Sequence, residues 1–225
     1  MAKLSKLGGT LFTQISSGIY RGKKLALPAL SSTRSTKSIV KGSFFDTWRV
    51  ELRGAVFIEC FGGSGAMALE ALSNGAKNVY AIEKDAAAHK IMQKNFELFG
   101  LGANAILGDC FERLPEILHD LQANMNGCSA VNLSESHTVN SNENSLSDPP
   151  RRVFVYLDPP FAIRQGFGGI YERVLALIAR LGSVQCELLI AIEHMSELEL
   201  PPKIGDFALL KSRKFGATTM SYYVK

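Results

Sequence analysis

The stretch AVFIECFGGSGAMALEALSNGAKNVYAIEKD, residues 55–85, decides the fold class. It opens with an apolar run at residues 55–60, passes through a glycine-rich turn, and continues with helix-forming residues up to Leu72. Asn74-Gly75 is a typical helix stop, and a second apolar run follows at residues 78–83. Apolar runs of this length separated by a helix are typical of buried strands in an α/β sheet. The stretch therefore predicts a strand–helix–strand unit.

The rest of the chain repeats this alternation. We expect a helix capped by Asp85 and ending at Gly100, and then elements at residues 105–107 (strand), 111–121 (helix), 153–157 (strand), 169–181 (helix) and 188–192 (strand). Two late apolar runs, at residues 207–210 and 220–224, have no helix between them and predict an antiparallel hairpin. The fold class is therefore α/β: a Rossmann-like, doubly wound, mostly parallel sheet with a C-terminal antiparallel hairpin.

A shorter, basic segment precedes the first strand of this sheet. Residues 15–18 and 21–25 predict a small β-hairpin with a basic turn, and residues 35–52 predict a helix with an aromatic face. We therefore divide the chain into an N-terminal extension at residues 1–53 and an α/β domain at residues 54–225.

Residues 122–150 interrupt the alternation of strands and helices. They hold six Asn and six Ser, no Lys or Arg, and almost no apolar run. Such a composition cannot bury a core, so we expect a flexible surface insertion.

The charge is unevenly distributed along the chain. Residues 1–54 carry ten Lys or Arg against two acidic residues, whereas the remainder carries 15 basic and 19 acidic residues, for a net charge of +4. A basic first quarter on a near-neutral body favours an anionic partner such as nucleic acid. The alternative is a basic surface that only contacts solvent.

The composition excludes several classes of protein. Hydrophobic residues make up 46% and charged residues 20% of the 225 residues, as in ordinary globular domains. No apolar stretch approaches the roughly 18 residues of a membrane span, and we expect no signal peptide and no membrane partner. None of the four cysteines forms a C-x-x-C pair, so we expect neither disulfides nor a metal site, and a cytoplasmic location.

The turn after the first strand has the features of a cofactor site. Its glycines let the backbone approach a ligand closely, and the following helix presents free N–H groups. Glu83 ends the second strand, where an acid can accept both hydroxyl hydrogens of a ribose. Asp109 follows the third strand and is placed to reach an adenine amino group.

Two cofactors fit this turn. The spacing Gly63-x-Gly65-x-x-Ala68 satisfies the dinucleotide fingerprint and would suit a nicotinamide-dependent oxidoreductase. Glu59, which precedes the turn, instead suits the ammonium group of S-adenosyl-L-methionine (SAM). Each acidic residue taken alone could also be a helix cap or a surface ion pair, so the turn leaves both cofactors open.

The motif DPPF, Asp158 to Phe161, follows the fourth strand at the sheet edge where ligands bind. An exocyclic amine on a base is a poor nucleophile because its lone pair is delocalised into the ring. The Asp158 carboxylate and the Pro159 carbonyl can accept its two N–H groups, Pro160 stiffens the turn, and Phe161 offers a face for stacking. The motif therefore favours SAM-dependent methylation of a planar amine, which needs no metal.

At this point the sequence resembles the RsmD-type 16S ribosomal RNA guanine-N2 methyltransferases. The N-terminal resemblance lies in residues 15–25, 33–36 and 44–46, and the later resemblance in residues 61–72, 82–85 and 158–161. The resemblance implies a cofactor site made of Glu59, Phe61, Gly62, Gly63, Ser64, Gly65, Glu83, Lys84, Asp109 and Cys110. It implies catalytic residues Asp158, Pro159, Pro160 and Phe161, and RNA contacts at Arg21, Lys23, Lys24, Arg34 and Lys37.

The resemblance also implies the substrate. We expect transfer of a methyl group from SAM to N2 of a guanine in small-subunit ribosomal RNA, within an assembling subunit, by a monomeric protein. Adenine-N6 methylases of DNA or RNA carry similar D/N-P-P motifs and are the main alternative, with a nicotinamide oxidoreductase behind them.

Overall fold

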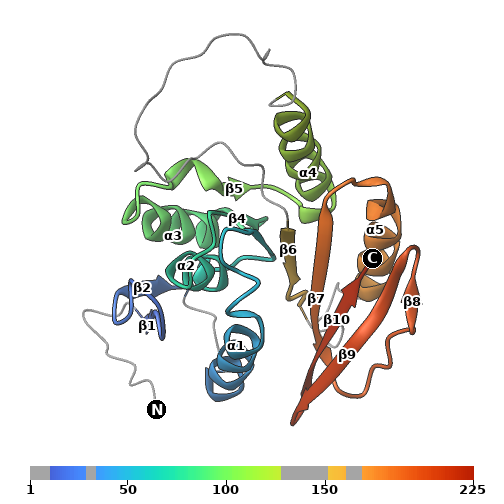
Figure 1. The fold of residues 1–225 in the computed structure, drawn as a ribbon. Coiled ribbons are helices and arrows are strands. Elements are labelled where there is room, and N and C mark those ends of the chain that lie inside the picture. The colour runs from blue at the N-terminus through green and yellow to red at the C-terminus, as the bar shows by residue number, and fades with distance from the viewer. Residues whose placement is uncertain (1–10, 29–33, 128–151, 161–168) are drawn as a thin grey trace.

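The computed structural model describes residues 11–28, 34–127, 152–160 and 169–225, which form an eight-stranded sheet and a separate two-stranded one (Figure 1). The strand order of the large sheet is β5-β4-β3-β6-β7-β10-β9-β8. Five strands are parallel: β3 (Val56–Cys60), β4 (Asn78–Glu83), β5 (Ala105–Leu107), β6 (Arg152–Leu157) and β7 (Glu187–Met195). Three are antiparallel: β8 (Lys203–Ile204), β9 (Phe207–Phe215) and β10 (Thr218–Val224).

The direction in which the sheet grows reverses between β3 and β6. From β3 the chain moves outward to β4 and β5, and then returns to place β6 on the other side of β3. Ligands of open α/β sheets bind at the carboxyl ends of the strands beside such a reversal. The fold therefore places a binding site where β3 and β6 end.

Helices cover both faces of the sheet. They are α1 (Arg34–Trp48), α2 (Ala66–Ser73), α3 (Ala86–Glu97), α4 (Cys110–Gly127) and α5 (Ile170–Arg180), with short 3₁₀ turns at Gly102–Asn104 and Leu181–Ser183. Helices α1, α2 and α3 share one hydrophobic core, and α4 and α5 share the other. The predicted Rossmann-like fold with a C-terminal antiparallel hairpin is confirmed.

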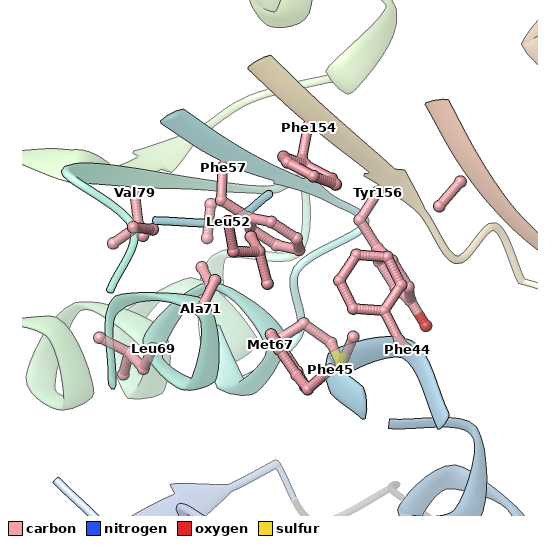
Figure 2. Close-up of a cluster of buried hydrophobic side chains, with 14 of the residues drawn as sticks. Phe44, Phe45, Leu52, Phe57, Met67, Leu69, Ala71, Val79, Phe154 and Tyr156 are labelled. Atoms are coloured by element: carbon pink, nitrogen blue, oxygen red, sulfur yellow. The ribbon is translucent and has the colours of Figure 1, made fainter. Parts of the chain in front are cut away.

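Aromatic side chains hold α1 against the sheet (Figure 2). The Phe44 ring meets Phe57 of β3 edge-on at 5.8 Å between centroids, and Tyr156 of β6 at 5.6 Å. Edge-to-face pairs at these distances are favourable beyond the area they bury. Helix α1, from the basic extension, is therefore part of the same core as the central strands.

The predicted N-terminal hairpin is also present. Strand β1 (Leu11–Gln14) pairs antiparallel with β2 (Lys24–Leu27). The turn between them is tied to α2, because the buried Glu70 carboxylate accepts hydrogen bonds from the backbone N–H groups of Ser16 and Ser17. The hairpin is therefore anchored on the helix that follows the glycine-rich turn.

Several element boundaries differ from the prediction. Helix α1 ends at Trp48 rather than at Leu52, although Leu52 is still buried, because the chain turns toward β3 through Gly54 at φ 74°. Helix α4 continues to Gly127, inside the region expected to be an insertion; residues 128–150 of that region lie outside the described residues.

The C-terminal hairpin is longer than predicted. Strand β9 continues through the polar and charged residues 211–214 to Phe215, because their backbone pairs with β10. The two-residue strand β8 was not predicted at all.

Candidate active site

The glycine-rich turn is fixed by the backbone and by two glycine conformations. The Gly62 N–H donates to the Ile82 carbonyl at 2.8 Å, which ties the turn to β4. Gly65 has φ 72°, and a Cβ there would lie 2.4 Å from the Phe96 ring. Gly63 has φ 54°, but a Cβ there would meet no atom of the described residues within 4 Å. Gly65 is therefore required by packing, whereas Gly63 borders open space that a ligand can enter.

Phe61 is the one described residue other than glycine with a positive φ, at 59°. Non-glycine residues adopt this conformation at a cost, and such strain clusters at functional sites. The strain lies at the first residue of the turn, directly after β3.

Two acidic residues hold the turn. Glu59, at the end of β3, is buried, and its Oε2 accepts the N–H of Ala68 in the first turn of α2 at 2.9 Å. Glu83, at the end of β4, accepts the Gly63 N–H with Oε2 and the Asp85 N–H with Oε1, both at 2.7 Å. Each Glu83 oxygen keeps a second lone pair, so the carboxylate can still accept hydrogen bonds from a ligand.

Asp109 follows β5 and is already engaged within the protein. Its Oδ2 lies 2.9 Å from the Lys84 ammonium, and its Oδ1 accepts the Phe111 N–H at 3.1 Å. Burial would raise the pKa of Asp109, but the hydrogen bonds from Lys84 and Phe111 outweigh it and lower this pKa. The sequence predicted the position of Asp109 but not its pairing with Lys84.

Two aromatic side chains, Phe61 and Phe111, lie next to Asp109. The Phe111 ring lies 6.0 Å from the Phe61 ring, and the Arg173 guanidinium lies 3.9 Å from the centre of the Phe111 ring. Cys110, between Asp109 and Phe111, is buried beside Cys60, and the Cys110 contact and burial raise the pKa of Cys60. The Cys60 thiol therefore behaves as a small apolar side chain rather than as a nucleophile.

Asp158 and Pro159 come directly after β6, at the same edge of the sheet as the glycine-rich turn. Pro159 is buried, whereas Asp158 and Pro160 are partly exposed; Phe161 lies outside the described residues. Cys60 and Leu157 are paired in the parallel register of β3 and β6, so the fold brings the ends of these two strands together.

A buried polar pair lies behind Asp158 and was missed by sequence reasoning. The Tyr156 hydroxyl donates to Oε2 of Glu193, at the end of β7, at 2.7 Å, and both residues are buried. Burial raises the pKa of Tyr156 well above its usual range, and Glu193 and Asp158 raise it further. In the sequence, 36 positions separate two residues that look like ordinary strand residues, so no local pattern indicated their contact.

The predicted RNA-binding residues divide into two groups. Arg21 and Lys23 are exposed in the turn between β1 and β2, and Lys24 is exposed at the start of β2. The Lys23 ammonium lies 4.7 Å from the centre of the Phe99 ring, which orients it over an aromatic surface. Arg34 and Lys37 lie in the first turns of α1, and their side chains lie outside the described residues.

The family model described as "Conserved hypothetical protein 95" matches residues 13–117 and 104–224, which together cover nearly the whole chain. The chain belongs to this family. The match spans the N-terminal hairpin, the glycine-rich turn and the segment after β6, so the site described above lies within the conserved hypothetical protein 95 family match.

Two relatives of this chain are named as ribosomal RNA methyltransferases. Ribosomal RNA small subunit methyltransferase D of Escherichia coli strain K12 is 26% identical over 93% of this chain and 88% of its own length. The protein of the same name from Haemophilus influenzae is 24% identical, over 93% and 92%. The resemblance to RsmD-type proteins predicted from the sequence is thereby confirmed.

A solved structure shares the fold of this family member. The structure named "Putative methyltransferase yhhF from Escherichia coli" is 25% identical, covers 95% of this chain and 98% of its own, and superposes with a TM-score of 0.64.

Within the described residues, no helix is long and apolar enough to cross a membrane.

Proposed function

We propose that this protein transfers the methyl group of SAM to the exocyclic N2 of a guanine in small-subunit ribosomal RNA. The chain is a SAM-dependent ribosomal RNA methyltransferase, the activity predicted from its motifs. The position of Asp158-Pro159 at the end of β6, beside β3 and its glycine-rich turn, carries the assignment of methylation at a planar amine. The choice of guanine N2 rests on the basic N-terminal segment and on the resemblance to RsmD-type proteins.

The residues around the turn fit SAM. Gly63 borders open space, the two Glu83 oxygens keep lone pairs for ribose hydroxyls, and Glu59 supplies negative charge near the turn for an ammonium group. When bound, SAM supplies a methyl group on a positively charged sulfur. The site is further shaped by four residues of the turn and by one residue next to Phe111: Phe61, Gly62, Ser64, Gly65 and Cys110.

We assign recognition of the adenine end of SAM to the region of Asp109 and Phe111. The carboxylate of Asp109 already holds Lys84, so its remaining lone pairs are the ones that can accept an adenine amino hydrogen. The pair between Lys84 and Asp109 keeps that carboxylate ionised and oriented, because its pKa is lowered.

Asp158 and Pro159 act on the base. The carboxylate of Asp158 and the carbonyl of Pro159 accept the two N–H groups of the target amine, which directs its lone pair toward the methyl group. Pro160 restricts the backbone that carries the carbonyl, and Phe161 stacks on the base. The buried pair of Tyr156 and Glu193 packs behind this segment and fixes the end of β6.

The basic extension supplies the affinity for RNA. Arg21, Lys23 and Lys24 contact phosphates from the exposed hairpin turn, and Arg34 and Lys37 do so from the start of α1. We place the protein in the cytoplasm as a monomer that acts on an assembling small subunit. The free, buried cysteines Cys60, Cys110 and Cys186 are compatible with a reducing compartment.

Methylation of adenine N6 is the second candidate, because Asp158 and Pro159 would hold that amine in the same way. The names of the relatives favour ribosomal RNA as the substrate but do not name the base. Nucleoside analysis of the methylated product separates the two candidates.

The test combines substrate, product and a matched pair of variants. Small subunits that lack the modification are incubated with labelled SAM, and the label should appear in N2-methylguanosine. Asp158→Ala should reduce transfer by at least about 100-fold, as when a group that contacts the reacting atoms is lost, while SAM affinity stays within twofold.

Asp148→Ala is the matched control, because Asp148-Pro149-Pro150 repeats the first three letters of the motif within the Asn- and Ser-rich segment of the sequence. This variant should retain full activity. Label in adenine, in DNA or in protein would overturn the guanine-N2 proposal, and equal loss in both variants would remove the assignment of Asp158.

A further inference from the structure

The C-terminal hairpin carries an excess of positive charge. This excess is not visible when the chain is divided only into a basic extension and a near-neutral remainder. Residues 207–225 hold four Lys or Arg and no acidic residue. The middle of the chain, residues 55–206, holds 11 basic and 19 acidic residues. Positive charge is therefore concentrated at the two ends of the sequence, with an acidic body between them.

The fold brings these two ends together. Nη1 of Arg213, on β9, donates to Oγ1 of Thr47, on α1, at 3.4 Å. The ammonium of Lys211 lies 4.4 Å from the centre of the Trp48 ring, also on α1. Figure 1 shows α1 and the long strand β9 on the same side of the molecule, at its lower end. The basic extension and the basic hairpin thus meet at the end of α1.

The charges on β9 are available to a partner. Arg213 and Lys214 are exposed, and within the described ranges no carboxylate lies within 4.0 Å of either. Strand β8 pairs only with residues 207 and 208, so β9 is the outer strand of the sheet where Arg213 and Lys214 lie. Successive side chains of a strand point to opposite faces, so a phosphate chain that follows this edge can reach Arg213 from the face covered by α1 and Lys214 from the other face.

The register of the sheet sets Arg213 level with the catalytic segment. Arg213 pairs with Met220 of β10, and Met220 pairs with Glu193 of β7. Ile192, the residue before Glu193, pairs with Leu157, the residue before Asp158. Three strand spacings of about 4.8 Å place the backbone of Arg213 roughly 14 Å from that of Asp158. Nucleotides next to a base held at Asp158 can span this distance.

We propose that the β9–β10 hairpin is a second RNA-binding surface, in which Arg213 and Lys214 contact phosphates flanking the target nucleotide. The proposal rests on the proposed function, because it takes the partner to be the RNA substrate. The β1–β2 turn and β9 would hold the RNA at two separate places. Lys211 lies over Trp48 and Tyr222 and supports the surface with its charge.

Charged residues on an outer strand can also serve only to prevent strands of different molecules from pairing. That explanation predicts aggregation when the charges are removed and no change in RNA affinity. The RNA surface predicts the reverse, so a binding measurement at several salt concentrations separates the two.

The experiment compares three double variants of the full chain with wild type. Arg213→Gln/Lys214→Gln removes two charges from β9, and Arg21→Gln/Lys23→Gln removes two from the β1–β2 turn. Arg180→Gln/Lys203→Gln is the control, because Arg180 ends α5 on the opposite face and Lys203 lies on β8, which pairs with the other end of β9 from Arg213; both are exposed. Affinity for a ribosomal RNA fragment is measured from 50 to 200 mM salt, values chosen at about the range over which phosphate contacts weaken binding strongly.

If the proposal holds, the β9 variant binds RNA at least about tenfold more weakly than wild type at low salt. Its slope of log affinity against log salt is shallower by about 1.4, which is two contacts at roughly 0.7 each for a single strand. SAM affinity and melting temperature stay at wild-type values, and the control variant binds RNA as wild type does. Lys214→Gln alone, which removes an exposed side chain, should lower the slope by about half as much.

The outcomes separate this proposal from the proposed function. If the β1–β2 variant loses affinity and the β9 variant keeps both affinity and slope, the second surface is wrong and the RNA substrate stands. If wild type binds no RNA, both proposals fail. Aggregation of the β9 variant with unchanged RNA affinity, or crosslinking of position 214 to a ribosomal protein rather than to RNA, would also overturn the second surface.

Discussion

The Nζ atom of Lys41 lies 2.7 Å from Oε2 of Glu70, whose side chain is completely buried. The same carboxylate accepts hydrogen bonds from Ser16 and Ser17 in the turn of the N-terminal hairpin. One buried charge on α2, the helix that begins at the glycine-rich turn, therefore joins α1 and the N-terminal hairpin.

Glu70→Ala should destabilise the protein by about 3–5 kcal/mol, because it leaves the Lys41 charge and the N–H groups of the turn without their acceptor in a buried place. Urea unfolding measures the change. Glu116→Ala is the control, because Glu116 pairs with Arg113 at 2.7 Å but both residues are exposed, and it should leave the urea midpoint nearly unchanged. Similar losses in the two variants would show that Glu70 does not anchor the hairpin.

Glu70 should also make stability depend on pH. Burial would raise the pKa of Glu70, but the charge and hydrogen bond of Lys41 and the bonds from Ser16 outweigh it and lower this pKa. The folded state therefore binds fewer protons at this group than the unfolded state, whose pKa is about 4.3. Its stabilisation is present above pH about 4.3 and is lost as the pH falls through the lowered folded value. The stability difference between wild type and Glu70→Gln should accordingly shrink in acid; a constant difference from pH 7 to pH 3 would contradict this.

Gly63→Ala should lower SAM affinity by more than about tenfold with a stability loss of about 1–2 kcal/mol, the cost of a left-handed conformation for alanine. The new methyl group would extend into the open space beside the turn. Gly100→Ala is the matched control: Gly100 has φ 71° and equally open surroundings, but it ends α3. It should lose comparable stability and keep SAM affinity, as measured by calorimetry. Equal SAM affinity in the two variants would move the cofactor away from Gly63.

Asn95→Ala should weaken both stability and SAM binding. The buried Asn95 amide donates to the carbonyls of Ala26 in β2 and Ser64 in the turn, at 3.0 and 2.9 Å, and its oxygen accepts the Ala26 N–H. Each backbone group that loses its hydrogen bond to Asn95 lowers the free energy of unfolding by about 1–3 kcal/mol. Asn104→Ala is the comparison, because the Asn104 amide bonds Asn78 and Val79 at 2.8 Å away from the turn. Loss of stability alone in both variants would show that Asn95 does not position Ser64.

The sequence predicted the elements whose signals are local. Strand β4 and strand β5 have the predicted bounds, because each is a short apolar run, and Asp85 caps α3 through the Ala88 N–H as expected. The glycine-rich turn and residues 158–160 each directly follow a buried strand, as the sequence predicted.

The remainder depended on contacts between distant residues. Strand β9 looked finished at Leu210, because the next four residues are polar or charged, yet β10 supplies the hydrogen bonds that extend it. Helix α4 continues to Gly127, past Leu121, where the apolar pattern used for the prediction ends. The pair of Tyr156 and Glu193 and the pair of Lys84 and Asp109 arise only when neighbouring strands align.

The contact between Gly18 and α2 limits how the N-terminal hairpin can be exchanged or engineered. A Cβ at Gly18 would lie 1.8 Å from the Ser73 carbonyl oxygen, so the hairpin turn and the end of α2 fit with no room for a side chain. Swapping the N-terminal segment for that of another protein would require both sides of this contact to be replaced together. The hairpin and α2 therefore have to be exchanged as one piece, whereas residues at the exposed tip of the hairpin can be altered without disturbing this contact.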